Sequence, residues 1–147
     1  MKTAALSCLL SCLCLLAACA AEEEAFADPA AAALLGEYDW VSSTVSAGGP
    51  QASVTPNSLG ERHGLAITSD SLVYSLDGRR RRGEAYRFVG GWDDAPGVAV
   101  EAVSSGDGRP DTRVLSLELQ PGGLLEVVPL DPRCVEGCAD VYERVGR

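Results

Sequence analysis

Apolar and polar residues alternate in short runs from Gly36 onward, and turn-forming residues interrupt these runs every 8 to 15 positions. Alternation with a period of two is typical of β-strands that bury one face. The interruptions are turn signals: Ser69-Asp70, Asp77-Gly78, Gly90-Gly91, Gly106-Asp107-Gly108 and Pro121-Gly122-Gly123. The pattern predicts eight strands, at about 35–45, 63–68, 71–76, 83–89, 97–103, 112–119, 124–130 and 139–145.

The connections between the predicted strands set the expected topology. Parallel strands need a long crossover, and no connection here is long enough to hold a crossover helix. Antiparallel strands in sequence order can close on themselves, which removes the exposed edges of an open sheet. We therefore predict an all-β domain over residues 35–147, an antiparallel up-and-down eight-stranded barrel.

The first 34 residues lack this alternation. Lys2 precedes an apolar run over residues 4–18, which is too short to span a bilayer comfortably and has the order of a secretory signal. Its end, Leu16-Ala17-Ala18-Cys19, resembles the lipobox of bacterial lipoproteins, in which the residue in the place of Cys19 is lipidated. An ordinary cleaved signal is the alternative. We interpret 1–18 as a lipoprotein signal peptide and 19–34 as the acylated cysteine and a flexible tether.

The lipobox resemblance implies a location. A mature Cys19 would carry three acyl chains of the palmitate kind, and each buried CH₂ group contributes on the order of 0.8 kcal/mol to membrane binding. Several chains therefore make the anchor effectively permanent. The expected location is the bacterial cell envelope, with the protein anchored by lipid in the outer membrane and facing the periplasm or the cell surface.

The cysteines that remain after export number two. The chain contains six, of which the signal removes three and the anchor uses Cys19, which leaves Cys134 and Cys138. In an oxidising compartment this pair predicts a disulfide. A redox dithiol or a metal pair is the alternative, but the spacing is C-x-x-x-C, and zinc would need carboxylate ligands because His63 is the one histidine. We expect no metal site.

The net charge excludes one class of partner. The formal charge is −9, and it becomes −10 when the signal takes away Lys2, the one lysine. Nucleic acid requires a basic surface, so no nucleic-acid partner is expected. The same charge disfavours flat docking on anionic lipid, which leaves the N-terminal lipid anchor as the membrane contact.

Catalytic signatures are missing from the sequence. One histidine excludes a two-histidine metal motif, and neither a Gly-x-Ser-x-Gly elbow nor a phosphate-binding glycine-rich loop is present. The segment 105–111 lacks the spacing of a calcium loop. We therefore expect no catalytic residue and no cofactor, and the protein is predicted not to be an enzyme.

Four consecutive cations stand out in this acidic chain: Arg79, Arg80, Arg81 and Arg82. They are expected at the tip of a hairpin, just before the strand predicted to begin at Gly83. One interpretation is a solvated tip, and the other is capture of an anionic ligand or partner. In a meander the loops alternate between the two ends, so the run would share an end with the long loop 46–62 and face away from the chain termini.

Short motifs resemble the lipocalin-like domains of small bacterial lipoproteins. They are Gly36-Glu37-Tyr38-Asp39-Trp40-Val41, Ser46-Ala47-Gly48-Gly49, Thr55-Pro56, Leu65-x-Ile67 and Tyr142-Glu143-Arg144. In lipocalins the first strand carries Gly-x-Trp, and an arginine of the last strand packs over that indole. Here Tyr38 takes the tryptophan's place, Trp40 lies two residues on, and the resemblance implies that Arg144 closes the barrel base. It also implies a lipocalin-like barrel that binds a small apolar or amphipathic ligand.

Two functions remain open for such a barrel. An interior void of at least about 300 Å³ would favour ligand binding, whereas a filled core would favour a protein-interaction or inhibitor module of the cell envelope. The positions predicted to face inward are either simple core or contacts of a ligand or partner. They are Tyr38, Trp40, Leu65, Ile67, Tyr86, Phe88, Leu115, Leu117 and Tyr142.

Overall fold

The computed structural model describes residues 29–45, 52–89, 97–106, 109–131 and 138–146. The chain divides into two units, Met1–Ala32 and Ala33–Arg147. A short helix, α2, covers Pro29–Leu34. Within the described residues, no helix is both long enough and apolar enough to cross a bilayer.

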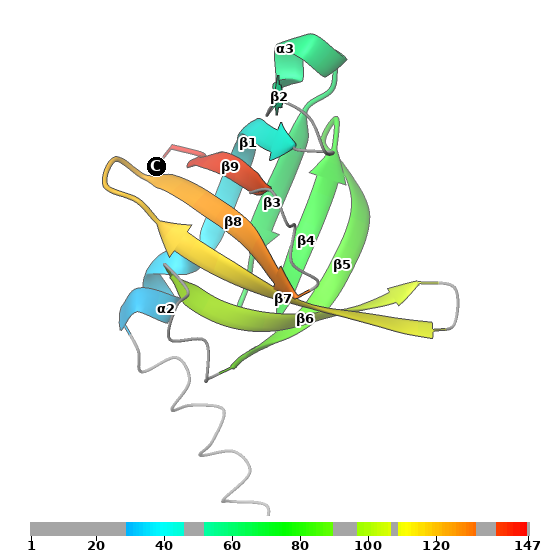
Figure 1. Cartoon of the computed structure of the whole chain (residues 1–147), viewed down its shortest axis with the longest axis vertical. Coiled ribbons are helices and arrows are strands. Elements are labelled where there is room, and N and C mark those ends of the chain that lie inside the picture. Colours follow the sequence, from blue (N-terminus) through cyan, green and yellow to red (C-terminus); the bar gives the residue numbers. More distant parts are fainter. Residues whose placement is uncertain (1–28, 46–51, 90–96, 107–108, 132–137, 147) are drawn as a thin grey trace, which may run out of the picture. The chain divides into compact units, whose positions relative to one another are not determined.

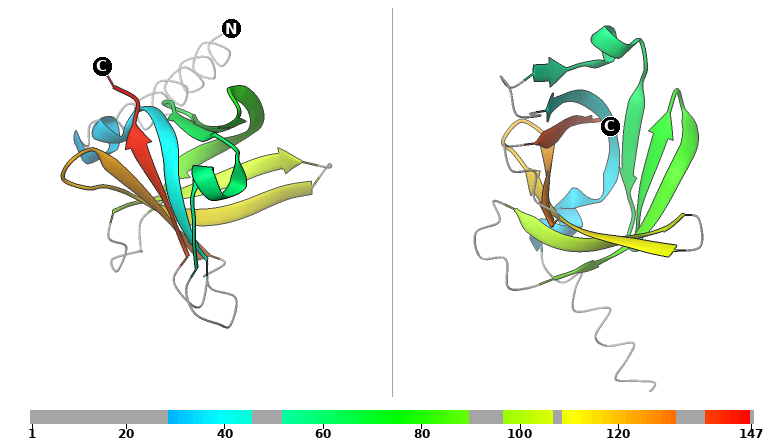
Figure 2. Two further views of the ribbon diagram at one scale, coloured as in Figure 1. Left: turned by 90° about the horizontal axis from the view of Figure 1, so that it is seen from above. Right: turned by 45° about the vertical axis from the view of Figure 1, so that its right-hand side comes forward.

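The second unit is a closed antiparallel β-barrel (Figure 1). Eight strands follow each other around it in sequence order, and the last pairs with the first (Figure 2). This confirms the predicted fold class. The strands are β1 (Gly36–Val45), β3 (His63–Ile67), β4 (Ser71–Leu76), β5 (Arg79–Phe88), β6 (Val98–Gly106), β7 (Arg109–Leu119), β8 (Leu124–Asp131) and β9 (Ala139–Arg144), with a ninth short strand, β2 (Ala52–Val54).

Part of the predicted long loop 46–62 is regular structure. Strand β2 pairs with the end of β1, where Thr44 lies opposite Ser53. The four-residue helix α3 (Pro56–Leu59) follows it, and the prediction of a plain loop was wrong here. A capping box explains the helix, because the Thr55 and Ser58 side chains each accept a hydrogen bond from the other residue's backbone N–H. Pro56 occupies the first turn, where its missing N–H costs no hydrogen bond.

The arginine run belongs to strand β5, so its predicted place at a hairpin tip was also wrong. Asp77 and Gly78 alone make the β4–β5 turn, and both have positive φ, 50° and 74°, as a tight two-residue hairpin turn requires. The strand therefore resumes at once, with Arg79 paired to Leu76. A bulge opposite Tyr74 and Ser75 then shifts the register within the run. The four arginines are consequently strand residues, and their side chains do not all point to the same face of the sheet.

The core lies inside the barrel and is built from inward-facing residues of every long strand. Leu72, Val100 and Leu125 are fully buried, and Leu34 of α2 joins the same cluster. We call the end of the barrel where β1 begins and β9 ends the closed end. We call the opposite end, where β1 ends and β3 begins, the mouth.

Candidate ligand site at the barrel mouth

A buried carboxylate, Glu84, lies on strand β5 opposite the core residue Leu72. The Glu84 side chain is 1% exposed and receives guanidinium hydrogen bonds from Arg82 and from Arg113. The Arg113 Nη2–Glu84 Oε2 distance is 2.7 Å. Burial of an unpaired carboxylate would be costly, and two arginines offset that cost.

Tyr74 completes this group, which we call the Glu84 ion cluster (Arg82, Glu84, Arg113 and Tyr74). Arg113 Nη2 donates to the Tyr74 hydroxyl at 2.8 Å, and the Arg82 and Arg113 guanidinium carbons lie 5.8 and 5.5 Å from its ring centroid. Burial raises the pKa of Tyr74, although both arginines favour the ionised form. The cluster therefore joins side chains of β4, β5 and β7 around one buried carboxylate.

A pocket of about 230 Å³ opens at the mouth. Apolar side chains from the end of β1, from β2 and from α3 form its outer walls: Val45, Val54 and Leu59. Trp40, Ser43, His63, Asp140 and Tyr142 complete the lining. The pocket is smaller than the void of about 300 Å³ expected of a ligand-binding barrel.

Hydrogen bonds fix the polar side of this pocket. The Trp40 indole Nε1 donates to Ser43 Oγ at 2.9 Å, and the Ser43 hydroxyl donates to Asp140 Oδ1. Trp40 also meets the His63 ring edge to face, with centroids 5.0 Å apart. His63 Nε2 lies 3.1 Å from a Glu61 carboxylate oxygen at the rim. The indole and the Asp140 carboxylate are therefore held in place before any ligand arrives.

Tyr142 forms the buried floor of the pocket. It pairs with Trp40 across the β1–β9 seam. Burial raises the pKa of Tyr142 far above its ordinary value, and the negative charges of Asp140 and of an ionised Tyr74 act in the same direction. The hydroxyl consequently stays protonated at physiological pH.

At the closed end, Arg144 covers Tyr38. Its guanidinium carbon lies 5.2 Å from the Tyr38 ring centroid, and its Nη2 donates to the Tyr38 hydroxyl at 2.7 Å and to the Leu35 carbonyl at 3.1 Å. Gly36 lies beside this arginine with a φ of 154°, a backbone conformation that residues with a side chain rarely adopt, whereas a Cβ there would meet Arg144 Nε at an ordinary contact distance of 3.5 Å. Trp40 lines the pocket at the mouth, so Arg144 packs on the Tyr38 ring and not on the indole.

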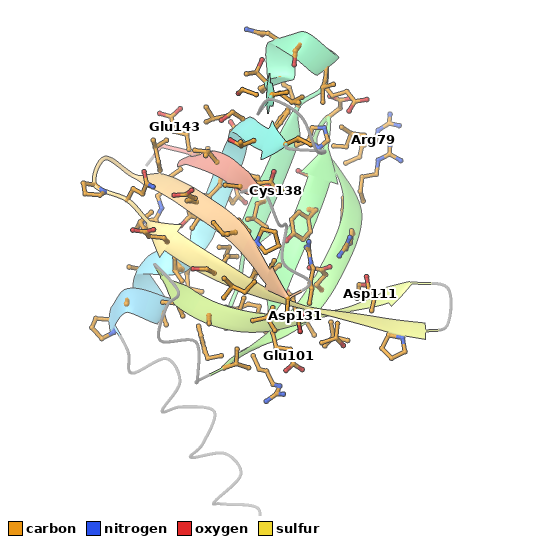
Figure 3. All side chains as sticks on the ribbon, viewed as in Figure 1. Arg79, Glu101, Asp111, Asp131, Cys138 and Glu143 are labelled. Atoms are coloured by element: carbon orange, nitrogen blue, oxygen red, sulfur yellow. The ribbon has the colours of Figure 1, made fainter. Side chains whose placement is uncertain are left out.

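The other predicted site residues are distributed as follows. Of the predicted inward positions, Leu65, Ile67, Leu115 and Leu117 are buried in the core, with Tyr86 and Phe88 packed against it. Arg79, Arg80 and Arg81 are exposed, and Arg79 points away from the barrel (Figure 3). Arg80 instead lines a hollow of about 330 Å³ on the outer face of the barrel.

The predicted cysteine chemistry falls mostly outside the described residues. Cys138 is half-buried immediately before β9 (Figure 3). Cys134 and Cys19 lie outside the described part, so the disulfide and the lipidation stay predictions. Among the described residues, no three His, Cys, Asp or Glu side chains gather as metal ligands would.

Sequence reasoning missed Glu84, Arg113 and Asp140. One signal for Glu84 was available, since alternation places it on the same face as Tyr86 and Phe88, which were predicted to face inward. The same alternation places Asp140 on the face of Tyr142 and Arg113 on the face of Leu115. The partners that these side chains meet depend on strand pairing, which has no local signal. Comparison with known proteins finds no matching family model, no matching curated protein and no matching solved structure.

Proposed function

We propose that this chain is a lipid-anchored lipoprotein of the bacterial cell envelope whose lipocalin-like barrel binds a small amphipathic ligand in the pocket at its mouth. The observation that carries the binding role is the pocket itself, which joins apolar walls at Val45, Val54 and Leu59 to a preordered polar side at Ser43 and Asp140. Pockets for small molecules combine these two kinds of lining.

The volume limits the ligand. Pockets for drug-sized molecules enclose about 300–1,000 Å³, whereas this one encloses about 230 Å³. None of the residues of the Glu84 ion cluster lines this pocket. The proposed ligand is therefore a small molecule, or the small end group of a larger molecule. The proposal includes no catalytic step and no cofactor.

Native mass spectrometry of the full chain, purified from membranes in mild detergent, tests the proposal. The expected spectrum shows a chain that begins at Cys19 with three acyl groups, and a non-covalent mass that leaves at higher collision energy. The anchor is overturned if the chain keeps residues before Cys19 or if Cys19 carries no lipid. A Cys19→Ala variant should also leave the membrane fraction.

A second candidate is a filled barrel that binds another envelope protein. The tight packing of Leu65, Leu72 and Leu115 favours it, since these side chains are at most 2% exposed. Its contact surface would include the exposed cations Arg79 and Arg81, which suit an acidic partner. Serine at the exposed positions 79–81 should then abolish capture of that partner at low salt, and unchanged capture would remove this candidate.

A further inference from the structure

The two carboxylates inside the barrel differ in how their charges are compensated. Glu84 pairs with two arginines. Asp140 receives the Ser43 hydroxyl on Oδ1 and has no ion-pair partner among the described residues. Asp140 also lines the pocket, where a ligand can reach it. Among the described residues, the Asp140 carboxylate therefore lines the pocket without a direct ion-pair partner.

The titratable neighbours leave this negative charge in place. His63 faces the same pocket, and its Nε2 is 3.1 Å from Glu61 at the rim. A neutral His63 leaves both carboxylates uncompensated, and a protonated His63 compensates one of them. Among the described groups of the lining and rim, the charges of Asp140, Glu61 and His63 therefore sum to a negative value in either state, which disfavours an anionic ligand. The Glu84 ion cluster carries one positive charge in excess, but its two guanidinium groups bind Glu84 and Tyr74 and do not line the pocket.

Aromatic and apolar surface surrounds the same carboxylate. Trp40 and Tyr142 lie opposite each other on β1 and β9, and both line the pocket. The Trp40 N–H already donates to Ser43, which fixes the indole in the wall. Aromatic rings attract cations, tryptophan most strongly, and the gain rises when the cation is desolvated. Val45, Val54 and Leu59 complete the wall with surface that suits methyl or methylene groups.

We propose that the mouth pocket selects small organic cations, amines or quaternary ammonium groups with apolar substituents, with Asp140 as the counter-ion and Trp40 and Tyr142 as the aromatic walls. This proposal rests on the proposed ligand-binding function and names its ligand class. A carboxylate recognises the charge, the rings and aliphatic side chains recognise the substituents, and the volume of about 230 Å³ excludes bulky cations.

Three probes of similar size test the charge preference: choline, its uncharged isostere 3,3-dimethylbutan-1-ol, and the anion 3,3-dimethylbutanoate. Each is titrated into the ¹⁵N-labelled full chain in detergent at low salt, and the indole N–H signals are followed. The Trp40 signal is assigned with a Trp40→Phe variant. We expect choline to bind about tenfold more tightly than the uncharged isostere and the anion to bind most weakly.

Asp140→Asn then tests the residue. It removes the charge but keeps an oxygen that accepts the Ser43 hydroxyl, so choline should bind about tenfold more weakly while the uncharged isostere binds as before. Asp39→Asn, exposed on the outer face of β1, makes the same charge change and should alter neither affinity. If Asp140→Asn fails to fold, the unmodified chain is titrated with and without added NaCl. The salt should weaken the binding of choline but not that of the uncharged isostere.

The outcomes separate this inference from the proposed function. Equal binding of choline and the isostere, or tighter binding of the anion, overturns the cation preference. Choline binding that is unchanged in Asp140→Asn overturns Asp140 as the counter-ion. Ligand binding stands in each of these cases. If no probe shifts the Trp40 signal, ligand binding in this pocket is overturned with it.

Discussion

Replacing Glu84 with glutamine tests whether the Glu84 ion cluster stabilises the barrel. Glutamine has the same shape and keeps one acceptor oxygen, but its amide N–H₂ group turns toward one of the two guanidinium groups that now bind the carboxylate. One charge-assisted hydrogen bond is lost, which costs about 1.5–3 kcal/mol. Two arginines also lose their counter-ion in the middle of the barrel.

The exposure of the arginines limits this cost. Removing one partner of a fully buried pair costs about 3–5 kcal/mol, but the Arg82 and Arg113 side chains are 44% and 28% exposed, so water solvates part of each charge. We therefore expect Glu84→Gln to lower the free energy of unfolding by about 2–3 kcal/mol.

Urea unfolding followed by circular dichroism measures this change. For a slope of about 1–3 kcal/mol per molar urea, the midpoint should fall by about 0.7–3 M with the slope unchanged. Glu101→Gln is the matched control, because Glu101 pairs with Arg87 at 2.7 Å across the next strand pair on the outer face (Figure 3). Their side chains are 25% and 70% exposed, so this loss should stay under about 1 kcal/mol.

A double-mutant cycle isolates the interaction itself. With Arg113→Met and Glu84→Gln combined, the loss should be smaller than the sum of the single losses by about 1–3 kcal/mol. The reasoning is refuted if Glu84→Gln costs no more than Glu101→Gln, or if the losses add without a coupling energy.

Three further predictions follow from the same barrel. Burial raises the pKa of Tyr142 above the 10.0 of an exposed tyrosine, so stability should hold below pH 10 and fall above it by about 1.4 kcal/mol per pH unit for this residue. Tyr142→Phe should make that decline shallower in urea unfolding between pH 9 and 11.5, and equal slopes would contradict this. Arg144→Gln should lower stability by about 1–3 kcal/mol through loss of the guanidinium contacts at the closed end, as thermal unfolding would show; an unchanged midpoint would contradict it. Arg82→Ser should destabilise the barrel by at least about 1 kcal/mol, while the neighbouring Arg81→Ser should stay within about 0.5 kcal/mol. Equal losses would mean that Glu84 does not distinguish the two arginines.

The strands could be predicted because their signals are local. The predicted strand 71–76 is β4 to the residue, and the predicted 124–130 differs from β8 by one. Closure followed from a general argument about edges, and the pairing of β1 with β9 bears it out. The four consecutive arginines show no alternation of apolar and polar residues, so β5 was predicted to begin at Gly83 instead of Arg79.

The site depends on distant parts of the chain, which explains why sequence reasoning found so little of it. Ser43 and Asp140 are 97 residues apart, and Arg113 is 29 residues from Glu84. Alternation in a single sequence indicates the face on which each residue lies but does not show which of them meet. The register of paired strands decides which of them meet, and that register is set by the whole barrel.

Strand β9 occupies the gap between β8 and β1, so residues 139–144 are the piece that closes the ring. During synthesis, a chain that ends before residue 139 has β1 and β8 with unpaired backbone groups along the seam. Such edges bind other extended chains. Truncation at the C-terminal side should therefore produce aggregates more readily than a smaller monomer, and the ribosome must deliver nearly the whole domain before the barrel can complete its fold.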